Sequence, residues 1–182
     1  MSGSHPAALL ARALGDLAGV VASLSPAAYA APAPGFPSSV GGQVRHCLDH
    51  VAALVTGAAS GRIDYDRRVR GTPVETSPPA ALAAIDRLAA GLVALAAADL
   101  DRDVVVVERL APADPPVGNR SSLGRELAFV LSHTHHHGAL IAPMARAVGG
   151  TIPERFGFAP STLAHLAAVE RERRGPAPPP AA

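Results

Sequence analysis

The feature that most constrains the fold of this chain is a series of apolar segments with helical spacing, separated by proline- and glycine-rich breaks. In the first segment leucine and valine recur every three or four residues, which places them on one face of an α-helix. Serine and proline before these segments, and glycine after them, are typical helix boundaries. The sequence therefore predicts four long helices and a short fifth one, over residues 6–24, 40–59, 79–98, 123–148 and 161–173.

Four long helices with almost no strand predict an all-α fold, a four-helix bundle with an accessory C-terminal helix. The β-branched run Asp103–Glu108 is expected to form a minor strand or extended segment. Residues 1–174 are then a single domain, followed by a disordered Pro/Ala tail over 175–182. Two of the connections are long, so consecutive helices need not be antiparallel neighbours. Pro143 should bend the last long helix.

Composition narrows the classes of function. The net charge of +1 provides no overall field for nucleic acid or acidic lipid, and the short charge runs are interpreted as solvated surface. Cys47 is the only cysteine, so no intramolecular disulfide can form. The N-terminus lacks a basic signal-peptide region, and no window offers about 18 uninterrupted apolar residues. These features predict a cytoplasmic protein that neither spans a membrane nor binds nucleic acid.

The segment "LSHTHHHGAL", residues 131–140, contains four of the chain's eight histidines. A helix turns by about 100° per residue, so His133 and His137 lie on one face, about 40° apart. His136 lies about 60° to the other side of His133, and His135 is about 160° from both members of the pair. The run therefore reduces to a pair, a neighbour that could join it, and an outlier.

A second pair, His46 and His50, lies four residues apart in the segment "RHCLDH" of an earlier predicted helix. Helical bundles build metal sites from inward-facing side chains on facing helices, and imidazole suits zinc, nickel, iron and copper. Two or three histidines of the later helix and one of the earlier helix would form a three-histidine site with an open coordination position, as in catalytic zinc sites. The alternative is a solvated histidine-rich surface that binds metal only weakly. His5 and His165 stand alone and are expected to be exposed.

Two carboxylates and one connector could lie next to such a metal site. Glu126 lies seven residues before His133 and could accept a hydrogen bond from an imidazole, but the helix dipole explains a carboxylate there equally well. Asp49, next to His50, is equally ambiguous. The connector "DYDRR" could cover an open end of the bundle and meet an anionic substrate through Tyr65, Arg67 or Arg68.

The stretch "SVGGQVRHCLDH", followed in a later helix by "ELAFVLSHTHHHGAL", resembles the DinB-like superfamily over most of the chain. The family pattern has a serine seven residues before the first histidine, which Ser39 and His46 match. It also has H-x-x-x-H in the later helix, which His133 and His137 match. The resemblance implies that His46, His133 and His137 are the metal ligands.

The same resemblance implies a four-helix bundle that binds a divalent metal, zinc or nickel with iron as an alternative, and that forms a homodimer. Some relatives are transferases or isomerases that use a low-molecular-weight thiol such as mycothiol, bacillithiol or glutathione. Family members often continue H-R-G-Q after the last histidine, whereas this chain has "HGAL", a departure that leaves the ligands in place. The residues expected to line the pocket or support the ligands are His50, His136, Glu126, Asp49, Tyr65 and Arg68.

Three functions are compatible with this pattern. In the first, the metal holds a thiol cofactor as the thiolate, which attacks an electrophilic small molecule. In the second, the protein is a metal-dependent hydrolase with Glu126 or Asp49 as the base. In the third, the metal only stabilises a non-catalytic bundle. The zinc-protease motif HExxH is excluded because Thr134 follows His133 where that motif requires glutamate. The sequence identifies no catalytic residue.

Overall fold

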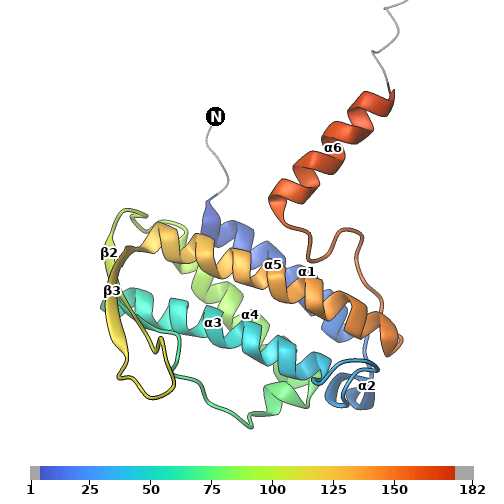
Figure 1. Ribbon diagram of the computed structural model, residues 1–182, viewed down its shortest axis with the longest axis horizontal. Helices are drawn as coiled ribbons and strands as arrows, with labels where there is room; N and C mark the ends of the chain where they lie inside the picture. The colour runs from blue at the N-terminus through green and yellow to red at the C-terminus, as the bar shows by residue number, and fades with distance from the viewer. Residues whose placement is uncertain (1–4, 175–182) are drawn as a thin grey trace, which may run out of the picture.

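The structure is a computed structural model that describes residues 5–174, and it is mainly helical (Figure 1). It confirms the predicted all-α bundle, and the boundaries of the long helices lie within one helical turn of the predicted ones. The predicted disordered tail, residues 175–182, lies outside the described residues. The long helices are α1 (Pro6–Ala22), α3 (Val40–Ser60), α4 (Pro78–Leu95) and α5 (Leu123–Ala147). The shorter ones are α2 (Pro26–Ala30), the 3-10 helix η1 (Pro73–Glu75) and α6 (Pro160–Arg174).

The four long helices pack in an order that differs from their order in the chain. Helix α1 packs against α4 and α5, and α3 packs against the same two helices. Helices α1 and α3 therefore occupy opposite corners of the bundle although they follow one another along the chain. This arrangement agrees with the expectation that long connections let consecutive helices be separated. It brings α3 and α5, the two helices that carry the histidine pairs, side by side (Figure 1).

Serine side chains define where α3 and α5 begin. The Ser39 hydroxyl accepts a hydrogen bond from the backbone N–H of Gly42 at 2.9 Å, and Ser122 accepts one from Arg125 at 3.3 Å. Each bond satisfies a backbone donor that the first turn of a helix leaves free. Helix α3 ends at Gly61, whose φ of 72° lies in the left-handed region that favours glycine. Helix α5 continues through Pro143 to its end.

A small three-stranded sheet closes the end of the bundle where α3 ends and α5 begins (Figure 1). Its central strand β2 (Asp103–Glu108) is the predicted extended segment. It pairs in parallel with β1 (Arg62–Asp64) and antiparallel with β3 (Val117–Ser122), and the sequence analysis predicted neither neighbour. Strand β1 contains three residues and β3 is polar and largely exposed, so neither has a local strand pattern. The sheet anchors the connector that follows β1 and crosses the histidine face of α3.

Apolar side chains from all four long helices form one continuous core. Helix α4 contributes to this core. Among the described helices, it is the one that is long and apolar enough to cross a membrane, judged by length and composition alone. Its side chains Ala81, Ile85 and Leu92 are buried against the neighbouring helices, and Asp86 and Arg87 interrupt its sequence. Helix α4 therefore packs one of its faces into the core of the bundle.

Helix α6 projects away from the bundle (Figure 1) and has no buried residue. It begins at Pro160, one residue before the predicted boundary. An ion pair of 3.1 Å between Arg155 and Glu170 connects it to the preceding loop. That loop crosses α5 where Gly157 packs on the backbone of Gly138, a contact in which an added Cβ would overlap the helix.

Gly41 allows the connector to approach the first turn of α3, and this contact gives a testable prediction. A Cβ at Gly41 would overlap the carbonyl oxygen of Glu75 and lie 2.6 Å from Cε1 of Tyr29. We expect Gly41→Ala to lower the free energy of unfolding by about 1–3 kcal/mol, measured by chemical denaturation, because buried backbone cannot easily move away. Gly19→Ala is the control, since its Cβ meets nothing within 4 Å and should be neutral or stabilising. Equal stability of the two variants would contradict this account.

Candidate metal centre

Two histidine pairs meet between α3 and α5. His46 and His50 project from α3, and His133 and His137 project from α5. The ring centroids of His50 and His133 are 4.0 Å apart, and those of His46 and His137 are 4.6 Å apart. Each pair is brought onto one helix face by its four-residue spacing, as predicted. The packing of α3 against α5 then joins the pairs into one cluster of four imidazoles.

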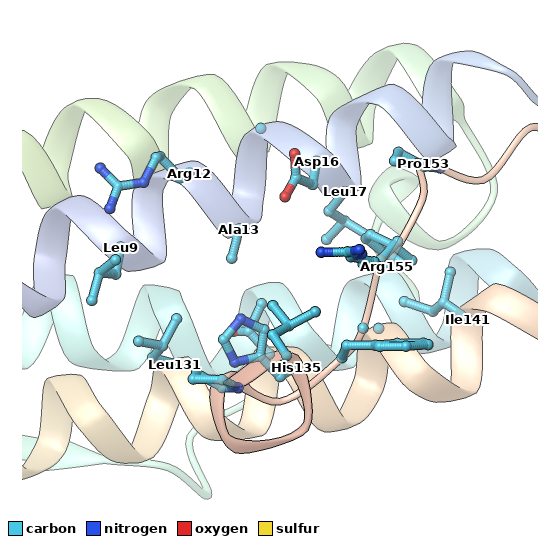
Figure 2. Close-up of a pocket in the computed structure, with 18 of the residues that line it drawn as sticks. Leu9, Arg12, Ala13, Asp16, Leu17, Leu131, His135, Ile141, Pro153 and Arg155 are labelled. Carbon is cyan, nitrogen blue, oxygen red and sulfur yellow. The ribbon is translucent and has the colours of Figure 1, made fainter. Parts of the chain in front are cut away.

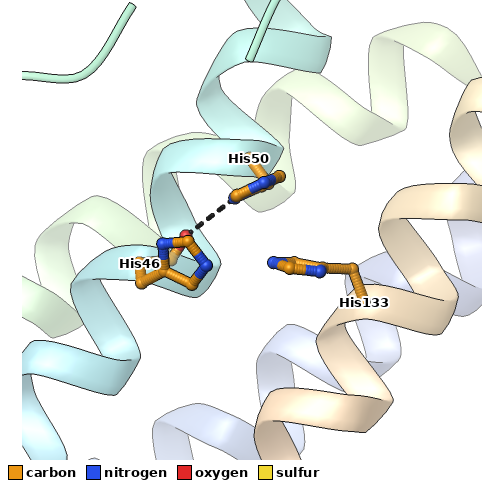
Figure 3. A group of neighbouring side chains, drawn as sticks. All are labelled: His46, His50 and His133. Carbon is orange, nitrogen blue, oxygen red and sulfur yellow. Dashed lines mark hydrogen bonds between the residues drawn. The ribbon is translucent and has the colours of Figure 1, made fainter. Parts of the chain in front are cut away.

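Three of these imidazoles converge most closely. One ring nitrogen each of His46, His50 and His133 lies within 4.8 Å of the other two. Figure 3 shows the His133 ring reaching from α5 toward the pair on α3. Zinc–nitrogen bonds are about 2.0–2.1 Å long, so small side-chain rotations would bring these nitrogens onto one ion. The three histidines are therefore positioned to bind a divalent metal.

His137, which the resemblance implies as a ligand, also belongs to the cluster. Its ring centroid lies 4.4 Å from that of His133, and its Nδ1 lies 2.9 Å from Oε1 of Gln43. His50, expected only to line the pocket, is instead part of the closest convergent group. The structure thus offers two candidates, His50 and His137, for the third ligand beside His46 and His133.

Hydrogen bonds at Nδ1 determine which nitrogen of each ring is free. His50 donates from Nδ1 to the backbone carbonyl of His46 at 3.1 Å, and His137 donates from Nδ1 to the amide oxygen of Gln43. Both rings therefore keep an unprotonated Nε2 that can bind a metal. Nε2 of His133 is buried without a hydrogen-bond partner among the described residues. A buried ring nitrogen without a partner is costly, and a bound metal ion would satisfy it.

Burial keeps the cluster uncharged. Burial first, and the neighbouring histidines second, lower the pKa of His46, His133 and His137 to about 4. The pKa of His50 is also lowered, again mainly by burial. These imidazoles are therefore neutral near pH 7, which is the state that coordinates a metal.

A buried network supports the cluster from the side of the sheet. Tyr65 stacks on His50 with a centroid distance of 5.5 Å, and its hydroxyl donates to Oε2 of Glu126 at 2.8 Å. Glu126 is fully buried and also accepts from Ser121 at 2.6 Å and from Arg125 at 2.7 Å. Burial and the charge of Glu126 raise the pKa of Tyr65, so its hydroxyl remains a donor. Glu126 thus positions Tyr65, whereas the sequence analysis considered a direct bond to an imidazole.

The remaining candidates lie around this cluster in different roles. Asp49 pairs with Arg45 at 2.6 Å, so its carboxylate is held on the neighbouring face of α3. His136 is exposed and meets His137 edge-on at 5.3 Å. Arg67 is exposed and lines a cavity of about 940 Å³ between α3 and α4. Arg68 lies at the cluster itself, where its Nη1 is 3.2 Å from Nδ1 of His46.

Two further residues, Gln43 and Phe129, shape the site and were not predicted from the sequence. Gln43 orients His137, and its position three residues before His46 on the same helix face could have indicated this. Phe129 packs against Tyr65 and, four residues before His133 on α5, against that histidine at a centroid distance of 5.9 Å. An aromatic residue at that spacing is equally typical of a core position, so the sequence did not distinguish the two roles.

His135 faces away from the cluster, as its helical angle predicted. It lines a separate cavity of about 720 Å³ between α1, α5 and the loop before α6, together with Arg12 and Asp16 (Figure 2). Cys47 and Thr134 also line this cavity, and burial raises the pKa of the Cys47 thiol to about 11. Cys47 therefore stays protonated near pH 7, which agrees with its interpretation as a core residue. His165 is exposed, as expected.

His5 lies outside the cluster and acts as the N-cap of α1. Its Nδ1 accepts a hydrogen bond from the backbone N–H of Ala7 at 3.2 Å. The residue is half-buried rather than exposed, because capping holds its ring against the first turn of the helix.

Comparison with known families accounts for this arrangement. The model of the DinB superfamily matches residues 9–141, which include most of α1 and α5, all of α3 and α4, and every histidine of the cluster. The chain belongs to the DinB superfamily. The pattern of Ser39, His46 and the H-x-x-x-H pair thus correctly indicated the family.

One curated protein is similar to part of this DinB-superfamily chain. FK506-binding protein 5 of Rhizopus delemar is 32% identical over 105 residues, which cover 57% of this chain and 27% of that protein. The matched segment thus spans about a quarter of that protein's length. No solved structure matches the chain significantly.

Proposed function

We propose that this DinB-superfamily protein is a metal-dependent enzyme that binds a divalent ion through three histidines and uses a low-molecular-weight thiol. The observation that carries the metal site is the convergence of His46, His50 and His133, with the buried Nε2 of His133 left without a partner. His46 and His133 are ligands in this proposal, and either His137 or His50 provides the third nitrogen. Zinc and nickel suit such imidazole ligands best, and iron is the alternative.

Three protein ligands leave a coordination position for a small molecule, which distinguishes such a site from a closed structural one. When bound, the ion would act as a Lewis acid that stabilises a thiol as its thiolate at neutral pH. The residues of the chain would hold the ion, keep the imidazoles neutral through burial, and orient them through Gln43 and Tyr65. This role supports transfer or isomerisation of an electrophilic substrate.

The positions of the two carboxylates favour the thiol over a hydrolase. A hydrolase needs a free base near the metal, and the candidates were Asp49 and Glu126. Asp49 pairs with Arg45, and Glu126 accepts hydrogen bonds from Tyr65, Ser121 and Arg125. Both carboxylates are therefore engaged in interactions that position other side chains.

Titration of the cobalt-loaded protein with thiols tests the proposal. Thiolate binding to cobalt(II) produces an intense charge-transfer absorption band, so we expect this band to appear with glutathione, bacillithiol or mycothiol. A matching assay with an electrophilic substrate then measures turnover. A metal-loaded protein that binds none of the three thiols would overturn the thiol proposal. A large loss of thermal stability on chelation, without any turnover, would instead identify a metal-stabilised bundle.

A further inference from the structure

Arg68 lies beside the histidine cluster, and two hydrogen bonds hold its guanidinium there. The connector after β1 carries this residue, and its Nε donates to the backbone carbonyl of Tyr65 at 3.1 Å. Its Nη1 donates to Nδ1 of His46 at 3.2 Å. The ion pairs of residues 5–174 do not include Arg68. The guanidinium is therefore a cation whose contact at the site is one imidazole nitrogen.

The hydrogen bond to Arg68 and a bound metal ion compete for His46. A guanidinium can only donate, so Nδ1 of His46 must accept and the ring proton resides on Nε2. A metal that binds Nδ1 takes the lone pair that Arg68 uses. A metal that binds Nε2 moves the ring proton to Nδ1. Nδ1 is then a donor and can no longer accept the hydrogen bond from Arg68. In either case, coordination by His46 breaks the contact with Arg68.

We infer that metal binding releases Arg68 and makes it an anion-binding group, so that the site takes a small molecule carrying a carboxylate next to its metal-binding atom. This inference rests on the proposed function and adds that the ligand is negatively charged. The guanidinium fork matches a carboxylate with two parallel hydrogen bonds. The contact of Nε with Tyr65 keeps the freed group close to the cluster.

The local charge balance supports an anionic ligand. Neutral imidazoles leave the full charge of a divalent ion in place, and Arg68 adds another positive charge at the same cluster. Three acidic side chains around the cluster already have partners. Arg45 pairs with Asp49 and also with Glu75, Arg125 pairs with Glu126, and Asp66 accepts a hydrogen bond from the backbone N–H of Arg109. Two adjacent cations in a partly buried site repel each other, and a bound anion removes that repulsion. By thermodynamic linkage, the anion and the metal then strengthen each other's binding.

A pair of matched thiols tests the inference without any activity assay. The probes are 3-mercaptopropionate, which carries a carboxylate, and 3-mercapto-1-propanol, which is neutral and similar in size. We expect the cobalt-loaded protein to bind the carboxylate thiol about tenfold more tightly, as measured by the charge-transfer band, because the carboxylate accepts charge-assisted hydrogen bonds from the Arg68 guanidinium and the neutral hydroxyl does not. Arg68→Gln should abolish this preference, and Arg68→Lys, which keeps the charge but not the fork, should retain part of it.

The neighbouring Arg67→Gln variant is the matched control, because Arg67 is exposed and lines the separate cavity between α3 and α4. It should keep the full preference. Arg68→Gln should also bind cobalt more tightly than the wild type when no anion is present, since both the competing hydrogen bond and the repulsive charge are gone. Equal affinity for the two thiols in the metal-loaded wild type, or an unchanged preference in Arg68→Gln, overturns the inference and leaves the metal site standing. A wild-type protein that binds no metal overturns the inference together with the proposed function.

Discussion

Replacing His46 or His133 by alanine should empty the metal site. Both residues belong to either proposed set of three ligands, so each substitution removes a ligand whether His50 or His137 is the third one. Loss of a residue that only hydrogen-bonds to a metal ligand lowers metal affinity by roughly 10- to 100-fold. We expect each of these variants, which lacks a ligand itself, to lose more than that. Elemental analysis of protein purified with its metal, followed by competition with a coloured chelator, measures the effect. Full occupancy in either variant would refute the site.

The other two histidines provide an internal comparison. His50→Ala and His137→Ala should each retain metal at reduced affinity, because each variant leaves the other imidazole close to His46 and His133. The double variant should behave like His133→Ala. Complete loss in only one of the single variants would instead identify that residue as the sole third ligand. His135→Ala is the control, because His135 faces the cavity on the other side of α5, and it should keep full occupancy.

Removing the carboxylate of Glu126 should cause a large loss of stability. Glu126 is fully buried and accepts the hydroxyl of Tyr65, which is itself buried. Glu126→Ala leaves that hydroxyl without a partner and opens a cavity, so we expect a loss of about 3 kcal/mol in the free energy of unfolding. For a chain of this size the melting temperature should fall by about 6–12 °C.

Two controls separate this effect from a general loss of charge. Glu126→Gln keeps an oxygen that can accept from Tyr65, so its loss should be less than half as large. Glu170→Ala removes an exposed ion pair with Arg155 and should change stability by less than about 1 kcal/mol. A second readout is metal affinity, which should fall in Glu126→Ala because Tyr65 no longer holds the ring of His50. Wild-type melting in Glu126→Ala would show that the buried network does not stabilise the fold.

The helices could be predicted because their signals are local. The apolar repeat and the serine caps act within a few residues of each other. In the structure Ser39 and Ser122 cap α3 and α5, and serine is the type of residue predicted there. The outer strands could not be predicted in this way. Strand β3 is exposed and polar, and it is a strand because Ser122 and its neighbours pair with Asp103 and the rest of β2. That pairing joins two segments of the connection between α4 and α5, and β1 pairs with β2 from a different connection, so neither outer strand contains its own signal.

The candidate site, like the fold, could be predicted from the sequence only in part. Four-residue spacing within a helix is sufficient to place His46 beside His50 and His133 beside His137, and to turn His135 away. Which helix faces which is decided by packing: α5 lies against α3 and α1, at the corner opposite α4. That arrangement brings His50 close to His133. It also directs Glu126 to Tyr65 and lets Arg68 reach His46 from a connector whose sequence specifies no conformation.

The amino-acid sequence alone was enough to establish a helical bundle, two histidine pairs and membership of the DinB superfamily, because these depend on periodicity and on motifs within single helices. Only the tertiary structure showed that the two pairs form one cluster, that Glu126 accepts a hydrogen bond from Tyr65, and that Arg68 donates one to His46. These relations depend on contacts between side chains far apart in the chain. Such contacts arise when the apolar faces of the helices pack together, and a single sequence carries no direct record of them.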